Sequence, residues 1–327
     1  MNVFERFQTL FVMTGIGVGL AAAQFDGVPA LADRLVLPFL LVTLFATFAG
    51  MPLANLRRAF RNRRFVATTL VVNFGWNPLL AVGLGAVFLA DHPALWVGLL
   101  MLLVTPCTDW YLVFTDLANG DVPLATSLLP YNLVLQLLLL PVYLALFADT
   151  LVQFRLQLLL ESIVLVLVVP LTLAVAVRRG VAAFDRQQWF AATVRPRLGP
   201  VQITFLALAV AAMFASQGGL VVERPDVLVR LALPVVAFYA VNFSLGLAIG
   251  RVLDFSHEEV ACFNCTVLSR NSPTALAIAV VAFPNEPLIP LALVVGPLVE
   301  LPLLSAVAGL LRRFERRGWT VGERAPL

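Results

Sequence analysis

The chain has 327 residues, of which 61% are hydrophobic and 13% are charged, and its mean hydropathy is +0.94. Soluble domains carry about 25% charged residues, so this composition excludes a soluble globular enzyme, a disordered chain and a disulfide-rich secreted scaffold. The net charge of +3 comes from Arg alone, because the chain has no Lys. In so apolar a chain the basic excess indicates membrane topology, and no nucleic-acid partner is expected.

Ten apolar stretches follow one another with short loops between them. A spanning helix needs about 20 apolar residues. We therefore predict an all-α polytopic membrane protein whose ten transmembrane spans cover residues 9–24, 33–54, 66–90, 94–118, 122–147, 156–177, 199–219, 227–250, 258–283 and 287–311. Ten spans place the most basic segments, 57–64, 178–197 and 312–317, on one side. The positive-inside rule then predicts a cell (inner or plasma) membrane protein with both termini in the cytoplasm.

The spans divide into two sets of five, residues 1–150 and 151–318, followed by a tail at 319–327. An odd number of spans in each half makes the two halves inverted relative to each other. In each half the fourth span is interrupted by polar residues and a proline, Pro106 in span four and Pro273 in span nine. Paired interrupted helices in inverted repeats indicate the binding site of a secondary transporter, although two ordinary proline kinks would look the same.

Three ionisable residues lie within predicted spans: Asp109 in span four, Arg270 in span nine and Glu300 in span ten. Such residues are expensive in a membrane and are usually functional. Asp109 and Arg270 form either an ion pair that opens and closes during transport, a permanent structural pair, or no pair. Glu300 is either a proton-exchanging carboxylate or a helix-packing group.

All three cysteines, Cys107, Cys262 and Cys265, fall in the two interrupted spans. Thiolates bind soft metal and metalloid ions strongly, whereas a free Cys is often only a small buried hydrophobe. No second Cys pair and no His cluster accompany them, so a structural zinc site is not expected.

Amide side chains flank the interrupted spans. Asn73, Asn77 and Pro78 interrupt span three, and Asn132 and Gln136 lie in span five. Amides in a membrane either hold helices together or line a polar pathway. We expect Asn73 and Asn132 to line the pathway.

These motifs resemble the arsenical-resistance branch, the arsenite efflux permeases, of the bile acid/sodium symporter superfamily. Pro106–Cys107 and the turn Leu117–Asp121 are similar to that branch in span four, and VVGPLVELPLL places Glu300 on its membrane glutamate. The resemblance implies that helices four and nine cross. It also implies a core bundle of spans three to five and eight to ten, which moves against a panel of spans one, two, six and seven.

Some positions depart from the pattern. Sodium-coupled members of the superfamily hold sodium with Glu and Gln in span nine, where this chain has Thr266 and Arg270. Sodium coupling is therefore not expected. The glutamate that precedes the Ala-Ile-Ala run in typical arsenite permeases is absent from Ser272–Leu276, and Asp109 replaces a small or apolar residue.

The first hypothesis is a proton-coupled efflux carrier for arsenite or antimonite, with Cys107 as the metalloid ligand, Cys262 and Cys265 as further thiols, and Glu300 and Asp109 carrying protons. The expected substrate-binding residues are Cys107, Thr108, Asp109, Asn73, Asn132, Arg270, Asn271 and Ser272. The alternative is an organic-anion carrier, not coupled to sodium, in which Arg270 binds the anion. A membrane receptor or enzyme is not favoured, because no nucleophile–base pair is present. The expected partners are the lipid bilayer, the small oxyacid and protons, and no cofactor is expected.

Overall fold

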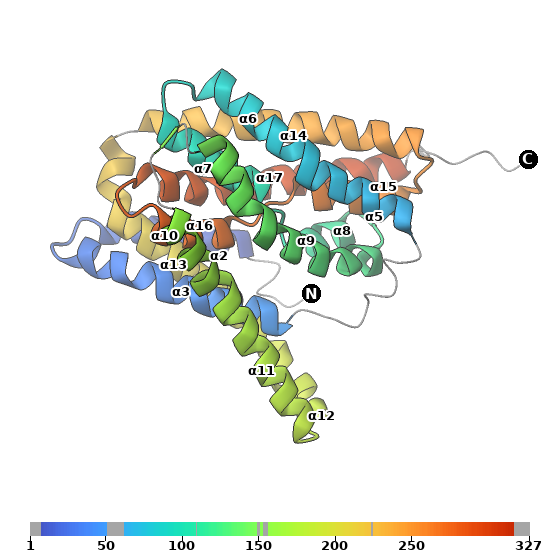
Figure 1. Cartoon of the computed structure of the whole chain (residues 1–327), viewed down its shortest axis with the longest axis horizontal. Coiled ribbons are helices and arrows are strands. Elements are labelled where there is room, and N and C mark those ends of the chain that lie inside the picture. Colours follow the sequence, from blue (N-terminus) through green and yellow to red (C-terminus); the bar gives the residue numbers. More distant parts are fainter. Residues whose placement is uncertain are drawn as a thin grey trace, which may run out of the picture. The chain divides into compact units, whose positions relative to one another are not determined.

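The computed structural model describes residues 8–50, 62–108, 110–148, 151–152, 156–223 and 225–316. Asp109, residues 57–61 of the first basic segment and the tail at 319–327 lie outside these ranges. The described residues form helices and no β-strand. The elements (Figure 1) are α2 (Gln8–Ala22), α3 (Val28–Gly50), α5 (Arg63–Val71), η2 (Val72–Trp76), α6 (Asn77–Phe88), α7 (Pro93–Val104), α8 (Trp110–Leu117), α9 (Val122–Tyr143), η3 (Leu144–Ala148), α10 (Leu156–Ile163), η4 (Val164–Val168), α11 (Val169–Ala183), α12 (Gln187–Trp189), η5 (Phe190–Val194), α13 (Arg195–Glu223), α14 (Pro225–Val252), α15 (His257–Leu268), α16 (Ser272–Ala282) and α17 (Leu288–Arg316).

The helices confirm the all-α membrane class. Among the described residues seven helices are long and apolar enough to cross a membrane: Val28–Gly50, Arg63–Phe88, Val122–Phe147, Gln157–Ala183, Gln187–Ser216, Val229–Val252 and Leu288–Arg316. Two shorter apolar helices, Pro93–Val104 and Ser272–Ala282, fall within predicted spans four and nine, which the structure breaks as the prolines predict. The total of ten spans, their inversion and the orientation of the termini stay predictions.

Two compact units make up the chain, and each draws on both halves of the sequence. The first unit contains Met1–Met51, Val152–Val229 and Ser272–Val295, and the second contains Pro52–Leu151, Arg230–Asn271 and Gly296–Leu327. Apart from Ser272–Val295, this grouping is the panel and core that the resemblance implies. In the first unit α13 packs on α2 and α3, and α16 packs on α10 and α3. In the second unit α15 packs on α5, α8 and α9.

A π-helical turn interrupts the helix that carries the predicted Asn73 and Asn77. The segments α5, η2 and α6 follow one another along one rod (Figure 1). Pro78 has no N–H, and its ring displaces the carbonyl four residues earlier, that of Phe74. The Tyr143 hydroxyl donates to this Phe74 carbonyl at 2.6 Å. The π-helical turn accommodates Pro78, and the Tyr143 hydroxyl satisfies the Phe74 carbonyl that this proline frees. A membrane segment requires such a donor, because lipid offers none.

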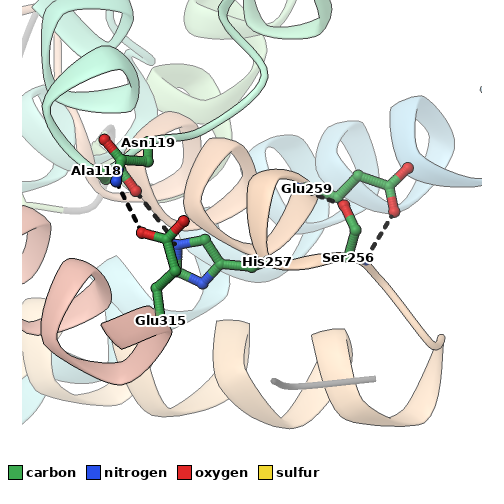
Figure 2. Close-up of polar contacts among 6 residues, drawn as sticks. All are labelled: Ala118, Asn119, Ser256, His257, Glu259 and Glu315. Carbon is green, nitrogen blue, oxygen red and sulfur yellow. Dashed lines mark hydrogen bonds and ion pairs between the residues drawn. The ribbon is translucent and has the colours of Figure 1, made fainter. Parts of the chain in front are cut away.

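One end of the second unit is fixed by a polar cluster where α15 begins (Figure 2). Ser256 and Glu259 form a reciprocal capping box at this helix start. The Glu259 carboxylate also accepts a hydrogen bond from the side-chain amide of Asn62, which caps α5. The starts of α5 and α15 are therefore held together by one carboxylate.

The turn between α8 and α9 joins the same cluster. The Asn119 amide donates to the Glu315 carboxylate at 2.7 Å, and Glu315 lies 3.7 Å from the His257 ring nitrogen (Figure 2). Gly120 packs so closely on α15 that an added Cβ would lie 3.0 Å from the Cys262 backbone nitrogen. The Gly-Asp turn of the sequence thus has a packing role, because any larger residue at position 120 would force Thr115 or α15 to shift.

We predict that replacing Tyr143 with Phe destabilises the protein, because the partly buried Phe74 carbonyl loses its donor. A buried acceptor left without its partner costs about 1–3 kcal/mol, so the melting temperature of the purified protein should fall by about 2 °C or more. Tyr131→Phe on the same helix is the matched control, because no hydrogen bond of the Tyr131 hydroxyl is seen among the described residues. Equal melting temperatures for the two variants would contradict the role of Tyr143.

Candidate functional site

The two interrupted helices meet through their backbones inside the second unit. The Cys107 N–H donates to the Ser269 carbonyl at 3.0 Å, and the Asn271 N–H donates to the Thr105 carbonyl at 2.8 Å. This pair of bonds forms an isolated antiparallel bridge between Pro106 and Arg270. The non-helical segment after α7 therefore pairs with the non-helical segment after α15, and we call residues 105–108 and 269–271 the crossing.

The crossing satisfies the carbonyls that the two prolines free. A proline displaces the carbonyl four residues before it. For Pro273 this is the Ser269 carbonyl, which accepts the Cys107 N–H. For Pro106 it is the Leu102 carbonyl, which accepts the Thr105 hydroxyl at 3.1 Å. Hydrocarbon offers no hydrogen bonds to these carbonyls. The Ser269 carbonyl therefore takes its donor from the other interrupted helix, and the Leu102 carbonyl takes its donor from the nearby Thr105 side chain.

Arg270 lies at the centre of the crossing with 3% of its surface exposed. Its guanidinium donates to the Leu103 carbonyl at 2.9 Å, the Leu268 carbonyl at 3.4 Å and the Val267 carbonyl. It also donates to Asn73 Oδ1 at 3.0 Å and lies 5.4 Å from the Phe238 ring centroid. The side chain thus reaches the carboxyl-terminal carbonyls of both α7 and α15, where the helix dipoles are negative.

Glu300 contacts the crossing through the backbone. Its carboxylate accepts the Arg270 N–H at 2.7 Å, and only 3% of the residue is exposed. Between two helices, this N–H has no intrahelical acceptor. The carboxylate of α17 therefore caps the break in span nine.

A ladder of three asparagines supports Arg270. Asn77 donates to Asn73 Oδ1 at 3.3 Å, and Asn242 donates to Asn77 Oδ1 at 3.0 Å. The ladder ends at Trp76, whose indole N–H donates to Asn242 Oδ1 at 3.1 Å. Sequence reasoning missed Asn242, which lies in an uninterrupted span with no proline or charge beside it. The same rule that selected Asn73, an amide within a span, would have found it.

The other predicted binding residues divide into two groups. Cys107 and Thr108 are both buried, and the Thr108 hydroxyl accepts a hydrogen bond from the Asn271 side chain at 3.4 Å. These three residues lie together at the crossing. Ser272 is buried at the start of α16, in the first unit.

The side chains of the remaining predicted residues are not joined to the crossing by any described hydrogen bond. Cys262 and Cys265 are buried one turn apart on α15. Asn132 is fully buried on α9, and neither of its amide atoms has a hydrogen-bond partner among the described residues. Within the described ranges, which contain all three cysteines, no group of three or more His, Cys, Asp or Glu side chains is arranged to hold a metal ion. Asp109 is outside the described ranges, so its pairing with Arg270 stays a prediction.

Comparison with known proteins supplies the family context. The Sodium Bile acid symporter family matches residues 37–224, more than half of the chain. The chain is 25% identical to the arsenical-resistance protein Acr3 of Corynebacterium glutamicum, over 81% of this chain and 74% of that protein. It is 23% identical to the Acr3 protein of Alkaliphilus metalliredigens, over 96% of this chain and 93% of that protein. It is also 25% identical to the uncharacterized transporter slr0944 of Synechocystis, over 96% of this chain and 89% of that protein.

Proposed function

The chain belongs to the Sodium Bile acid symporter family, and we propose that it exports arsenite or antimonite across the cell membrane in exchange for protons. Membership makes it a membrane transporter and not an enzyme. Two similar proteins carry the name arsenical-resistance protein, which supports the metalloid substrate.

One observation carries the proposal, namely the position of the Cys107 thiol. The residue lies at the crossing with 4% of its surface exposed, next to the Thr108 hydroxyl and within the segment that pairs with Asn271. Arsenite at neutral pH is an uncharged hydroxide, so a soft thiol ligand and a few hydrogen-bonding groups suffice to bind it. The crossing offers all of these in one place.

Proton coupling is assigned to Glu300. A proton on this carboxylate removes its negative charge and weakens the hydrogen bond that it accepts from the Arg270 N–H. Protonation would then loosen the break in span nine, and release of the proton would restore it. Asp109 is proposed as a second proton carrier, and alternating access would move the crossing relative to a fixed barrier.

The organic-anion alternative is less well supported. It requires Arg270 to bind the substrate, but the guanidinium has only five N–H donors. Four hydrogen bonds already direct it to Leu103, Val267, Leu268 and Asn73. Binding an anion would therefore break contacts that satisfy two helix ends.

We predict that Cys107→Ser abolishes arsenite uptake into everted membrane vesicles under an imposed proton gradient. Serine keeps the size and the backbone bond to Ser269 but lacks the soft sulfur, so we expect the rate to fall by at least about tenfold, equivalent to about 1.4 kcal/mol of binding. Ser244→Ala is the control, because this serine lies on an exposed face of α14 and bonds only within its helix. Full uptake by Cys107→Ser would disprove the thiol site. Collapse of uptake in Arg270→Gln, with Cys107→Ser unaffected, would support the organic-anion reading.

We predict that Glu300→Gln separates exchange from proton-driven transport. The glutamine carbonyl still accepts the Arg270 N–H but cannot bind a proton, so arsenite exchange between preloaded vesicles and medium should persist. Uptake driven by the proton gradient should fall by at least about tenfold. The control is Glu315→Gln, which changes the same side chain on α17 at the polar cluster with Asn119 and His257. Unchanged gradient-driven uptake by Glu300→Gln would show that Glu300 is not the proton carrier.

A further inference from the structure

A basic hairpin joins α11 to α13 in the first unit. It consists of residues 179–197, which form the end of α11, the short α12, the π-helical turn η5 and the start of α13 (Figure 1). The segment contains four arginines and one aspartate, Asp185, and it has no lysine or glutamate. Its four positive charges thus face a single negative charge.

The helix α3 indicates where this basic hairpin lies relative to the bilayer. With 23 residues α3 is about 35 Å long, slightly more than the hydrocarbon core of about 30 Å. Its last residue, Gly50, lies beside Leu198, because a Cβ added to Gly50 would be 3.9 Å from the Leu198 side chain. The Arg178 guanidinium donates to the Ala49 carbonyl at 2.8 Å. The end of α3 is therefore level with the two residues that flank the basic hairpin.

The basic hairpin extends past this level by about the depth of the headgroup layer. The last five residues of α11, 179–183, add about 8 Å to the helix. The headgroup layer is about 5–8 Å deep on each side of the bilayer. Near the tip, Phe184 is 79% exposed and Trp189 is 51% exposed. Exposed aromatic rings at this depth are typical of the belts that membrane proteins place among lipid headgroups.

The arginines of the basic hairpin can reach a ligand. Arg179, Arg186, Arg195 and Arg197 are exposed, and none of their guanidinium groups has a hydrogen bond or an ion pair with another described residue. Arg195 also lies within electrostatic range of Arg178, so positive charges of α11 and α13 lie close together. A phosphate beside them would relieve this repulsion, and its oxygens would accept paired guanidinium hydrogen bonds.

We propose that the basic hairpin binds the phosphate headgroups of anionic phospholipids. Clusters of four or more basic residues next to a spanning helix are typical of such recognition. The positive-inside rule predicts that this side faces the cytoplasm, where the leaflet carries a negative surface potential. The arginines contact the phosphates, and Phe184 and Trp189 lie among the headgroups and fix the depth of the hairpin. This inference concerns the first unit alone and does not depend on which substrate the protein carries.

The test compares melting temperatures of the purified full-length protein in detergent with added phosphatidylglycerol or phosphatidylcholine. We expect phosphatidylglycerol to raise the melting temperature of the wild type by about 3 °C or more over phosphatidylcholine, because a ligand that binds the folded state stabilises it. A triple variant with Arg179→Gln, Arg195→Gln and Arg197→Gln should lose this difference. The matched control is Arg312→Gln, Arg313→Gln and Arg316→Gln, which removes the same charge from α17 and should keep it.

Three results would overturn the proposal. The first is a wild-type protein that the two lipids stabilise equally. The second is an equal loss of the phosphatidylglycerol effect in both triple variants, which would indicate a response to net charge alone. The third is equal stabilisation of the wild type by soluble glycerol phosphate, which would indicate a site for a soluble anion.

Tryptophan fluorescence of the wild type decides the question even if the hairpin variant fails to fold. In mixed vesicles of the two lipids, brominated phosphatidylglycerol should quench the fluorescence more than the same amount of brominated phosphatidylcholine. The excess should disappear in Trp189→Phe, because this side chain lies at the tip of the basic hairpin. Equal quenching by the two brominated lipids, or an excess that Trp189→Phe retains, would contradict a lipid site at the hairpin.

Discussion

The structure of the second unit depends on one constraint, the need to satisfy backbone carbonyls that prolines free within a membrane. Pro106 and Pro273 each break a helix where hydrocarbon offers no hydrogen bonds. The Cys107 N–H satisfies the Ser269 carbonyl, and the Thr105 hydroxyl satisfies the Leu102 carbonyl. The crossing adds the Asn271 N–H on the Thr105 carbonyl, so each break also depends on the other. An unsatisfied buried carbonyl costs about 1–3 kcal/mol, so neither break is expected to persist without the other.

Arg270 and Glu300 complete this arrangement from opposite sides. The guanidinium supplies donors and positive charge to the carboxyl-terminal ends of α7 and α15, while the carboxylate accepts the one N–H that the break leaves. At an effective dielectric of about 20, a second positive charge within about 4 Å of the guanidinium would be disfavoured by about 4 kcal/mol. The same residues that stabilise the break thus determine which ions can approach the proposed binding site.

Several of these features could be predicted from the sequence. Hydropathy located the seven long apolar helices of the described residues, since apolar runs of helical length are a local property. Pro106 and Pro273 identified the two interrupted spans. The polar residues predicted to bind substrate or carry protons include Cys107, Thr108, Asn271, Asn73 and Glu300, which lie at the crossing or contact Arg270 there. Their roles in transport stay predictions. The family resemblance also predicted that helices four and nine cross, and it predicted most of the grouping of the chain into two units.

The partners of these residues could not be predicted, because they depend on three-dimensional neighbours. The sequence suggested Asp109 as one possible partner of Arg270, and that pairing stays a prediction. It could not reveal the backbone carbonyls and the Asn73 amide that the guanidinium contacts, since such groups occur throughout the chain. Asn242 was missed because no proline or charge stands next to it in α14, whereas Pro78 directly follows Asn77 in the span that drew attention to the other amides. The assignment of Ser272–Val295 to the first unit follows from packing on α10 and α3, which no local pattern encodes.

The most direct test of this account is the initial rate of arsenite uptake into everted vesicles, measured under the same proton gradient in sodium medium and in sodium-free choline medium. Because the Arg270 guanidinium already contacts the carbonyl ends of α7 and α15, where a second positive charge would be disfavoured, the account predicts equal rates in the two media. Uptake only in the presence of sodium would contradict the role of Arg270 while leaving the substrate intact. Absence of uptake in both media, by protein shown to be folded and inserted, would contradict the proposed function itself.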